Sequence, residues 1–347
     1  MSIFYDDGVI KRLHLELSNA CNSKCPLCPR TGTPVVGNSG IKNLTLDDIK
    51  KINFKNLEFM LLCGNFGDPM LCPEIYEICD YIIEKGVDIS IKTNGGMYDK
   101  KFWYDFGKLL SKKSHYCDSK ITFDIDGLED TNHIYRVGTD FNKIKENVQS
   151  FIDGGGHAVW QYMIFKHNEH QVQEAGDMAM QMGFKKFEIK KPSDRGRYKK
   201  EKYKHLIKDI ELKYTEKVFD IEGNEYDFNK WVHTKQKTPV ACKGSTQKEL
   251  FISCEGDVFP CCWWGTAYME SKYDNNENMI STLTNFDNNI RTNSWDNIVE
   301  QYYLKRDEMK TLFKYGCVRE CNKQCGNKRK SETYRKIILF DRYQSTV

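Results

Sequence analysis

The sequence predicts an α/β fold, with a partial (β/α)6 barrel followed by a small cysteine-rich domain that contains a β-hairpin and a helix. Three observations lead to this prediction. Short β-forming runs alternate with helical patterns through the first 190 residues, as in parallel strand–helix units. Basic residues then dominate a stretch with little apolar periodicity, and cysteines gather near both ends of the chain. We therefore predict a barrel, a basic connecting segment, a cysteine-rich domain and a tail over residues 1–190, 191–240, 241–330 and 331–347.

Six predicted strands make up the barrel, and each is a short run rich in β-forming residues. They cover residues 12–17, 57–62, 87–92, 120–124, 157–164 and 186–190. Thr45 has the sequence context of a helix N-cap, and a glycine closes each of the helical patterns over 73–85, 140–152 and 169–182. Six such units are typical of an incomplete barrel. In parallel barrels the catalytic residues lie on the loops that follow the strands.

The composition excludes several classes of protein. The 347 residues carry a net charge of +3, and 39% hydrophobic with 29% charged residues is ordinary for a soluble globular protein. The chain shows no signal peptide and no run of the roughly 18 apolar residues that a membrane span requires. We expect a cytoplasmic protein, with neither a membrane nor a nucleic acid as its favoured partner. Fourteen cysteines without an export signal favour metal ligation over disulfides.

The first cysteine cluster follows the end of the first predicted strand. Cys21, Cys25 and Cys28 are separated by three and then two residues. Three thiolates on one loop can bind three irons of a [4Fe–4S] cluster and leave the fourth iron without a protein ligand. A structural zinc site is the alternative, but such sites use four ligands, commonly in evenly spaced pairs. The spacing therefore favours an iron–sulfur cluster with one open iron.

This C-x3-C-x2-C loop after a first strand resembles the radical S-adenosylmethionine (SAM) superfamily. The resemblance implies a partial barrel fold and two cofactors, a [4Fe–4S] cluster and SAM. It assigns cluster binding and catalysis to Cys21, Cys25 and Cys28, and contact with the cofactor to Leu27 inside the loop.

A second stretch after the next predicted strand carries the same resemblance. Residues 63–69, Cys-Gly-Asn-Phe-Gly-Asp-Pro, are similar to the family's Gly-Gly-Glu-Pro stretch, which binds the amino group of the cofactor's methionine. The resemblance assigns cofactor binding to Gly67, Asp68 and Pro69. Phe66 stands where the family has its first glycine, and Asp68 is one methylene shorter than the usual glutamate. An ordinary loop closed by proline is the alternative.

Five further residues match positions where the family approaches SAM. Thr93 and Asn94 end the third predicted strand, and Asp126 follows the fourth. Arg136 is similar to an arginine that pairs with the cofactor's carboxylate, and a guanidinium fork suits that partner. Asn168 matches a position near the adenine. The alternatives are a surface salt bridge for Arg136 and a turn residue for Asn168.

The second cysteine region resembles the C-terminal extension called SPASM, or its shorter twitch form, which holds auxiliary [4Fe–4S] clusters. The first half of that pattern, C-x13-G-x4-C from Cys242 to Cys261, is matched across a predicted hairpin turn at residues 255–257. The second half departs from the full pattern, because it consists only of Cys317, Cys321 and Cys325 in a C-x3-C-x3-C run. The cysteine count implies one auxiliary cluster, and a zinc knuckle is the alternative.

The resemblance implies an enzyme that cleaves SAM reductively to a 5′-deoxyadenosyl radical, which abstracts hydrogen from its substrate. We expect a peptide, a protein or a small polar molecule as substrate, and an electron donor such as flavodoxin or ferredoxin. A non-catalytic iron–sulfur redox sensor or regulatory binding protein on the same scaffold is the alternative, with the basic run 191–208 as its contact. The matching cofactor motifs favour the enzyme.

Overall fold

The chain folds into two compact units, and each unit joins segments that lie far apart in the sequence. The structure, a computed structural model, describes residues 8–32, 40–112, 119–190, 192, 217–219, 225–227, 243–274, 286–307 and 335–339. The first unit comprises Met1–Ala20, Pro34–Ile89 and Thr234–Ser331. The second comprises Cys21–Thr33, Ser90–His233 and Glu332–Val347.

The first unit is built on strands that surround β1 (Arg12–Leu15). This strand lies between β2 (Phe59–Leu62) and β9 (Glu249–Ile252) and is parallel to both. β10 (Val258–Phe259) pairs antiparallel with β9, which confirms the predicted hairpin. The pairing of β9 with β1 was not predicted, because the sequence pattern placed the hairpin in a separate domain. The predicted domain boundaries themselves stay a prediction.

Short helices complete the first unit, and several were predicted. Thr45 forms a capping box with Asp48, in which each side chain accepts a hydrogen bond from the backbone N–H of the other. Cys72 and Cys79 are fully buried and belong to the core of this unit. The helices are α4 (Leu46–Lys50), the 3-10 helix η1 (Pro69–Leu71), α5 (Ile75–Glu84), α10 (Lys243–Gln247), α11 (Cys262–Asp274) and α12 (Trp295–Leu304).

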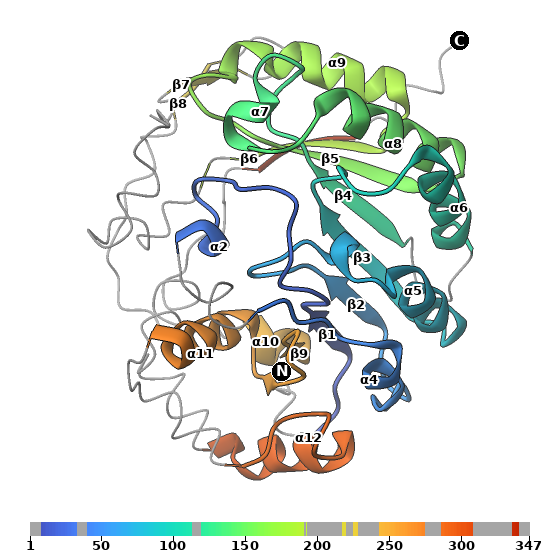
Figure 1. Cartoon of the computed structure of the whole chain (residues 1–347), viewed down its shortest axis with the longest axis vertical. Helices are drawn as coiled ribbons and strands as arrows, with labels where there is room; N and C mark the ends of the chain where they lie inside the picture. Colours follow the sequence, from blue (N-terminus) through green and yellow to red (C-terminus); the bar gives the residue numbers. More distant parts are fainter. Residues whose placement is uncertain are drawn as a thin grey trace. The chain divides into compact units, whose positions relative to one another are not determined.

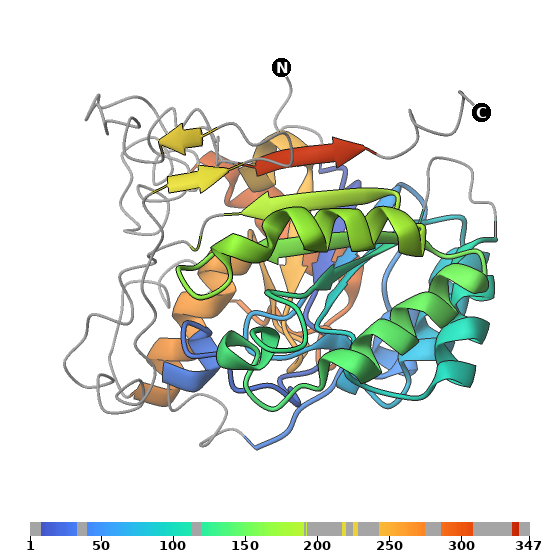
Figure 2. The same ribbon diagram turned by 90° about the horizontal axis from the view of Figure 1, so that it is seen from above.

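The second unit contains the remaining parallel strands. β3 (Asp88–Thr93) enters this unit at Ser90 and is followed in order by β4 (Lys120–Asp124), β5 (His157–Met163) and β6 (Lys186–Lys190). These four strands confirm the predicted βα pattern. β11 (Arg335–Leu339) runs beside β6 in the opposite direction, as Figure 2 shows in red. No strand was predicted in this segment, which the sequence analysis assigned to a tail.

Helices cover one face of these strands. Figure 1 shows α6, α8 and α9 along the same side of β4, β5 and β6. Trp103 of α6 and Phe151 of α8 pack on Phe123 of β4, with ring centroids 5.4 and 5.7 Å from it, and all three are fully buried. This unit contains α2 (Pro29–Gly32), α6 (Lys100–Leu110), α7 (Asn132–Tyr135), α8 (Phe141–Asp153), the 3-10 helix η2 (Glu169–Gln171) and α9 (Val172–Met182).

The predicted connecting segment contains a further pair of strands. β7 (Lys217–Phe219) and β8 (Glu225–Asp227) pair antiparallel. A strand of three residues is too short to show a periodic pattern, so the sequence did not predict these two strands. Of the helices that the structure describes, none combines the length and apolar character needed to cross a membrane.

Candidate functional site

The loop with Cys21, Cys25 and Cys28 belongs to the second unit, and its three thiols form no disulfide. Polar groups of the loop surround the sulfur atoms. The backbone N–H of Ser23 donates to Cys21 Sγ at 3.4 Å, and the Ser23 hydroxyl lies 3.1 Å from Cys25 Sγ. A hydrogen bond to sulfur favours the thiolate, which is the form that binds iron.

Two predicted cofactor residues reach this loop from other parts of the second unit. Asn94 follows β3, and its Nδ2 lies 3.8 Å from Cys21 Sγ. Arg136 follows α7, and its Nη1 lies 3.8 Å from Cys25 Sγ. Hydrogen bonds and positive charge at the sulfur ligands tune the reduction potential of an iron–sulfur cluster. The structure thus brings Asn94 and Arg136 to the cysteine loop.

Arg136 already has a buried partner within the chain. Its Nε donates to Asp126 Oδ2 at 2.6 Å, and its Nη2 lies 3.8 Å from Asp124 Oδ2. The Arg136 side chain is 13% exposed and that of Asp126 is fully buried, so this is not the surface salt bridge that the sequence analysis considered. Burial lowers the pKa of Arg136, but the negative charge of Asp126 raises it well above its ordinary value. Arg136 therefore stays charged beside Cys25.

Asp126 and Asn168 hold the turns that follow β4 and β5. The second oxygen of Asp126 accepts from the backbone N–H of Met163 at 2.6 Å, while burial raises its pKa to about 6. Asn168 Nδ2 donates to the carbonyl groups of Asp126 and Met163 at 2.8 and 3.0 Å. Its Oδ1 accepts from the Phe165 backbone N–H at 2.7 Å. Asn168 is therefore a buried turn residue, and its predicted contact with adenine stays a prediction.

An apolar cluster lies against the cysteine loop. Cys25, Tyr135 and Phe165 form its buried centre, and Leu27 and Met163 pack against them. The Tyr135 and Phe165 ring centroids are 4.6 Å apart. Leu27, predicted to contact the cofactor, thus contributes apolar surface that shields Cys25 from water.

Thr93 has a local structural role at the end of β3. Its hydroxyl accepts from the backbone N–H of Gly95 at 3.1 Å, and Gly95 has a φ of +73°, which side chains other than glycine rarely adopt. The backbone N–H of Gly96 donates to Asn94 Oδ1 at 2.8 Å. This turn holds Asn94 where it meets Cys21.

Gly67, Asp68 and Pro69 lie in the first unit, in a loop packed tightly on the backbone that follows β1. A Cβ at Gly67 would lie 2.0 Å from the carbonyl oxygen of Ser18, so only glycine fits there. The Asp68 carboxylate accepts from the Met70 backbone N–H at 3.0 Å and caps η1, in which Pro69 is the first residue. The loop is thus a rigid turn, and its predicted contact with the cofactor stays a prediction.

Glu16 is a buried acidic residue beside this loop that the sequence analysis did not select. Its Oε1 accepts from the backbone N–H of Phe66 at 2.7 Å, while its Oε2 is buried and has no hydrogen-bond partner among the residues that the structure describes. Burial raises the pKa of Glu16 to about 7, although the N–H groups of Phe66, Asn65 and Gly67 lower it in part. The available signal was the position of Glu16 between Leu15 and Leu17 in the first predicted strand. An acid buried at such a position is unusual, because unpaired acidic side chains are rarely buried.

Replacing Glu16 by glutamine should change how stability depends on pH. The pKa of Glu16 is about 7 in the folded chain and 4.5 as its ordinary value, so unfolding releases a proton between these two pH values. The wild type therefore loses stability as pH rises through this window, by about 3 kcal/mol, and Glu16→Gln should not. Urea unfolding at pH 4.5 and 8 measures the difference.

Glu58→Gln provides the matched control, because the Glu58 side chain is 41% exposed. Because Glu16 is unchanged in this variant, Glu58→Gln should lose about as much stability between pH 4.5 and 8 as the wild type does. Equal pH dependence of Glu16→Gln and the wild type would contradict the buried-acid description.

The predicted auxiliary-cluster residues fall almost entirely outside the described part of the chain. Cys261 is half-buried at the end of the hairpin, whereas Cys242, Cys317, Cys321 and Cys325 lie outside the described residues. Cys254 is fully buried, and burial raises the pKa of its thiol well above the ordinary range. That property disfavours Cys254 as a thiolate ligand.

The cysteine loop fits an iron–sulfur cluster by the chemistry of its donors. It offers three thiols that form no disulfide, and two of them have an N–H donor near sulfur from a residue elsewhere in the unit. Within the described ranges, no group of three Cys, His, Asp or Glu side chains is arranged to hold a metal ion. The donor set, rather than a preformed ligand geometry, therefore marks this loop as the candidate centre.

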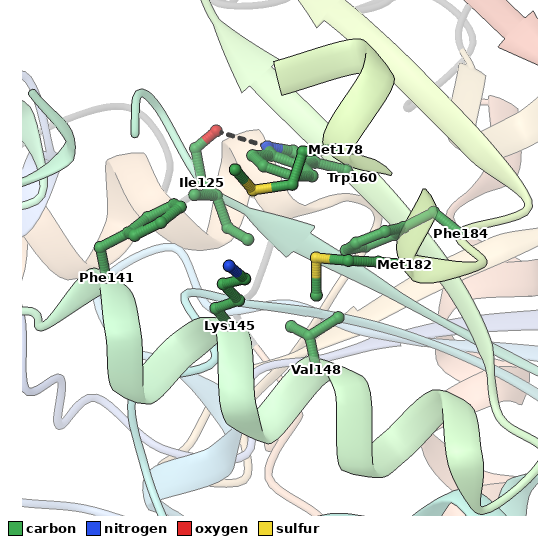
Figure 3. Close-up of a pocket in the computed structure, with 8 residues that line it drawn as sticks. All are labelled: Ile125, Phe141, Lys145, Val148, Trp160, Met178, Met182 and Phe184. Carbon is green, nitrogen blue, oxygen red and sulfur yellow. Dashed lines mark hydrogen bonds between the residues drawn. The ribbon is translucent and has the colours of Figure 1, made fainter. Parts of the chain in front are cut away.

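A separate hollow lies on the helix-covered face of the second unit. Figure 3 shows Met178 beside Trp160 and Met182 beside Phe184, with Lys145 of α8 on the opposite side of the hollow from Trp160. The Trp160 indole is already hydrogen-bonded to the carbonyl of Ile125 at 3.0 Å. The lining is otherwise apolar, so this hollow is a gap between core side chains and offers no set of groups for catalysis.

The chain is similar in sequence to one protein family and in structure to several solved proteins. Residues 15–179 match the model of the Radical SAM superfamily. No curated protein matches the chain. Among solved structures, Streptococcus suis SuiB bound to precursor peptide SuiA is similar, with 15% identity and a TM-score of 0.53 over 85% of this chain. The chain spans 65% of the SuiB chain.

A second solved structure, anSMEcpe with bound AdoMet, covers 92% of this chain and 100% of its own at 11% identity, with a TM-score of 0.47. At 15% identity the likeness to SuiB extends to the fold alone. That fold is a mostly parallel sheet with helices, as the sequence predicted.

Proposed function

We propose that this chain is an enzyme of the radical SAM superfamily, which cleaves SAM by radical chemistry and abstracts hydrogen from a peptide, protein or small polar substrate. The match of residues 15–179 to the Radical SAM superfamily model supports the family. The observation that supports this proposal most is the cysteine loop, where Asn94 and Arg136 direct donors at Cys21 and Cys25. In the solved structure, SuiB is bound to a precursor peptide, which favours a peptide among these substrates.

Cys21, Cys25 and Cys28 would hold a [4Fe–4S] cluster, which supplies the electron that breaks the carbon–sulfur bond of SAM. Arg136 provides a fixed positive charge at Cys25, and Asp126 fixes the orientation of that guanidinium. Tyr135 and Phe165 keep water away from the loop. These residues therefore orient the reacting groups and lower the local dielectric, which strengthens each charge interaction.

The C-terminal cysteines would hold one auxiliary [4Fe–4S] cluster, and a protein such as flavodoxin or ferredoxin would deliver the electrons. Cys242 and Cys261 belong to this set, together with two of Cys317, Cys321 and Cys325. The match of the first half of the SPASM pattern supports this assignment. In this division of the chain, residues 1–190 carry the SAM chemistry and residues 241–330 carry the second cluster.

Iron content tests the proposed cofactors. The full chain, reconstituted without oxygen, should hold about eight irons, because each of two clusters contains about four. A variant with Cys21, Cys25 and Cys28 all changed to Ala should hold about four, and Cys262→Ser should retain the full complement. Elemental analysis with sulfide determination measures these values. If the wild type holds about four irons together with zinc, the C-terminal cysteines form a zinc knuckle and not an auxiliary cluster. If the triple variant retains all of its iron, the assignment of a cluster to Cys21, Cys25 and Cys28 is wrong.

A further inference from the structure

The strands of the second unit have two chemically different faces. Phe123 of β4 and Trp160 of β5 lie buried on the face that α6, α8 and α9 cover. The other face carries polar and charged side chains, among them Lys92 of β3, Gln161 of β5 and Lys190 of β6. Parallel strands usually carry apolar side chains on both faces, because other elements pack on both faces of the sheet. This polar row therefore needs an explanation other than core packing.

Two lysines of the row share one neutral acceptor. Lys92 Nζ donates to Gln161 Oε1 at 2.9 Å, and Lys190 Nζ donates to the same oxygen. Gln161 is held in place by its own amide, since Nε2 donates to Asp124 Oδ1 at 2.6 Å. The arrangement brings two ammonium groups together at an amide oxygen, which carries no charge to neutralise them.

Each carboxylate on this polar face lies near a cation. Glu188 lies 2.8 Å from Lys186 Nζ and 3.8 Å from Lys190 Nζ, and its side chain is 1% exposed. Asp124 and Asp126 both lie near Arg136. Lys92 has no carboxylate within ion-pair distance in the part of the chain that the structure describes. Glu188 thus faces both Lys186 and Lys190, and Lys92 adds a further positive charge beside Lys190 at the Gln161 oxygen.

The positive charge at Lys92 and Lys190 is connected to the cysteine loop by direct contacts. Asp124, which holds Gln161, lies 3.8 Å from Arg136 Nη2, and Arg136 Nη1 lies 3.8 Å from Cys25 Sγ. The Lys190 side chain is only 19% exposed, and in such a partly buried place an added anion is attracted more strongly than at an open surface. An anionic group bound at the lysines would lie on the same polar face as Arg136.

We propose that Lys92 and Lys190, separated by Gln161, form a subsite that binds an oxyanion of the substrate, either a carboxylate or a phosphate group. This inference rests on the proposed function, because it places the substrate beside the loop that would hold the cluster. Each ammonium group offers three donors, so an oxyanion can replace the Gln161 oxygen as their shared acceptor.

Calorimetric titration of the full chain with succinate and with inorganic phosphate tests the subsite. The wild type should bind at least one of the two anions. Lys92→Gln and Lys190→Gln should each bind it at least about tenfold more weakly, because each loses a charge-assisted hydrogen bond. Lys100→Gln is the matched control, since it removes the same charge from a side chain that is 62% exposed and paired with Glu146. It should bind as the wild type does.

The two probes separate the possible groups. Binding of succinate alone identifies a carboxylate, binding of phosphate alone identifies a phosphate, and binding of both supports a general oxyanion subsite. A wild type that binds neither, or lysine variants that bind as tightly as Lys100→Gln, would overturn the proposal. Lys92→Met provides a second neutral variant if Lys92→Gln fails to fold. SAM cleavage by the same wild-type preparation is measured separately, so a failure of the proposed function remains distinguishable from a failure of the subsite.

Discussion

A variant in which Cys21, Cys25 and Cys28 are all alanine should produce no 5′-deoxyadenosine from SAM. The three thiols are the proposed ligands of the cluster that delivers the electron, and without them SAM has no iron to bind. Cys21 and Cys28 are half-buried and only Cys25 is buried, so the variant should still fold. Chromatographic assay of the reduced, oxygen-free reaction measures the product, and circular dichroism verifies the fold.

Cys262→Ser is the control for the loss of a thiol elsewhere, and it should retain cleavage. Cys262 begins α11, and the sequence analysis did not count it among the cluster ligands. If the triple variant still forms 5′-deoxyadenosine above the level of a protein-free reaction, the assignment of the radical centre to this loop is wrong.

Arg136→Ala should lower the free energy of unfolding by about 3–5 kcal/mol, because it leaves the fully buried Asp126 carboxylate without its cation. The resemblance to the family predicted an effect mainly on SAM binding, but the partner that the structure gives Arg136 makes folding equally sensitive. Urea unfolding at pH 8 measures the loss.

A second substitution separates the buried ion pair from other effects of removing Arg136. The double variant Arg136→Ala with Asp126→Asn should recover much of the lost stability, because the uncompensated charge is gone. Asparagine can still accept from the Met163 N–H, which Asp126 binds in the wild type. A loss below about 1 kcal/mol for Arg136→Ala would return this pair to the class of exposed salt bridges.

Local sequence patterns were sufficient for much of the fold. Strands β3 to β6 and helices α5, α8 and α9 carry strong periodicity and clear end signals such as Gly183, whose φ is +89°. Pairing between distant segments leaves no such pattern. The parallel contact of β9 with β1 and the antiparallel contact of β11 with β6 depend on tertiary packing, so the sequence analysis placed both segments outside the barrel.

The candidate site divides in the same way. Cys21, Cys25 and Cys28 lie on one loop, so their spacing is visible in the local sequence. The partner of Arg136, the turn held by Asn168 and the buried state of Glu16 depend on neighbours many residues away. Each of these polar side chains is recognisable in the sequence only as an isolated residue.

Reductive cleavage of SAM by the reconstituted full chain tests the central claim most directly. The protein is reduced without oxygen and supplied with SAM, and both 5′-deoxyadenosine and methionine are measured over time. We expect the two products in equal amounts, formed only when iron, reductant and the wild-type cysteine loop are all present. A chain that carries its full iron at Cys21, Cys25 and Cys28 yet leaves SAM intact would contradict the claim and would favour a non-catalytic iron–sulfur sensor on this scaffold.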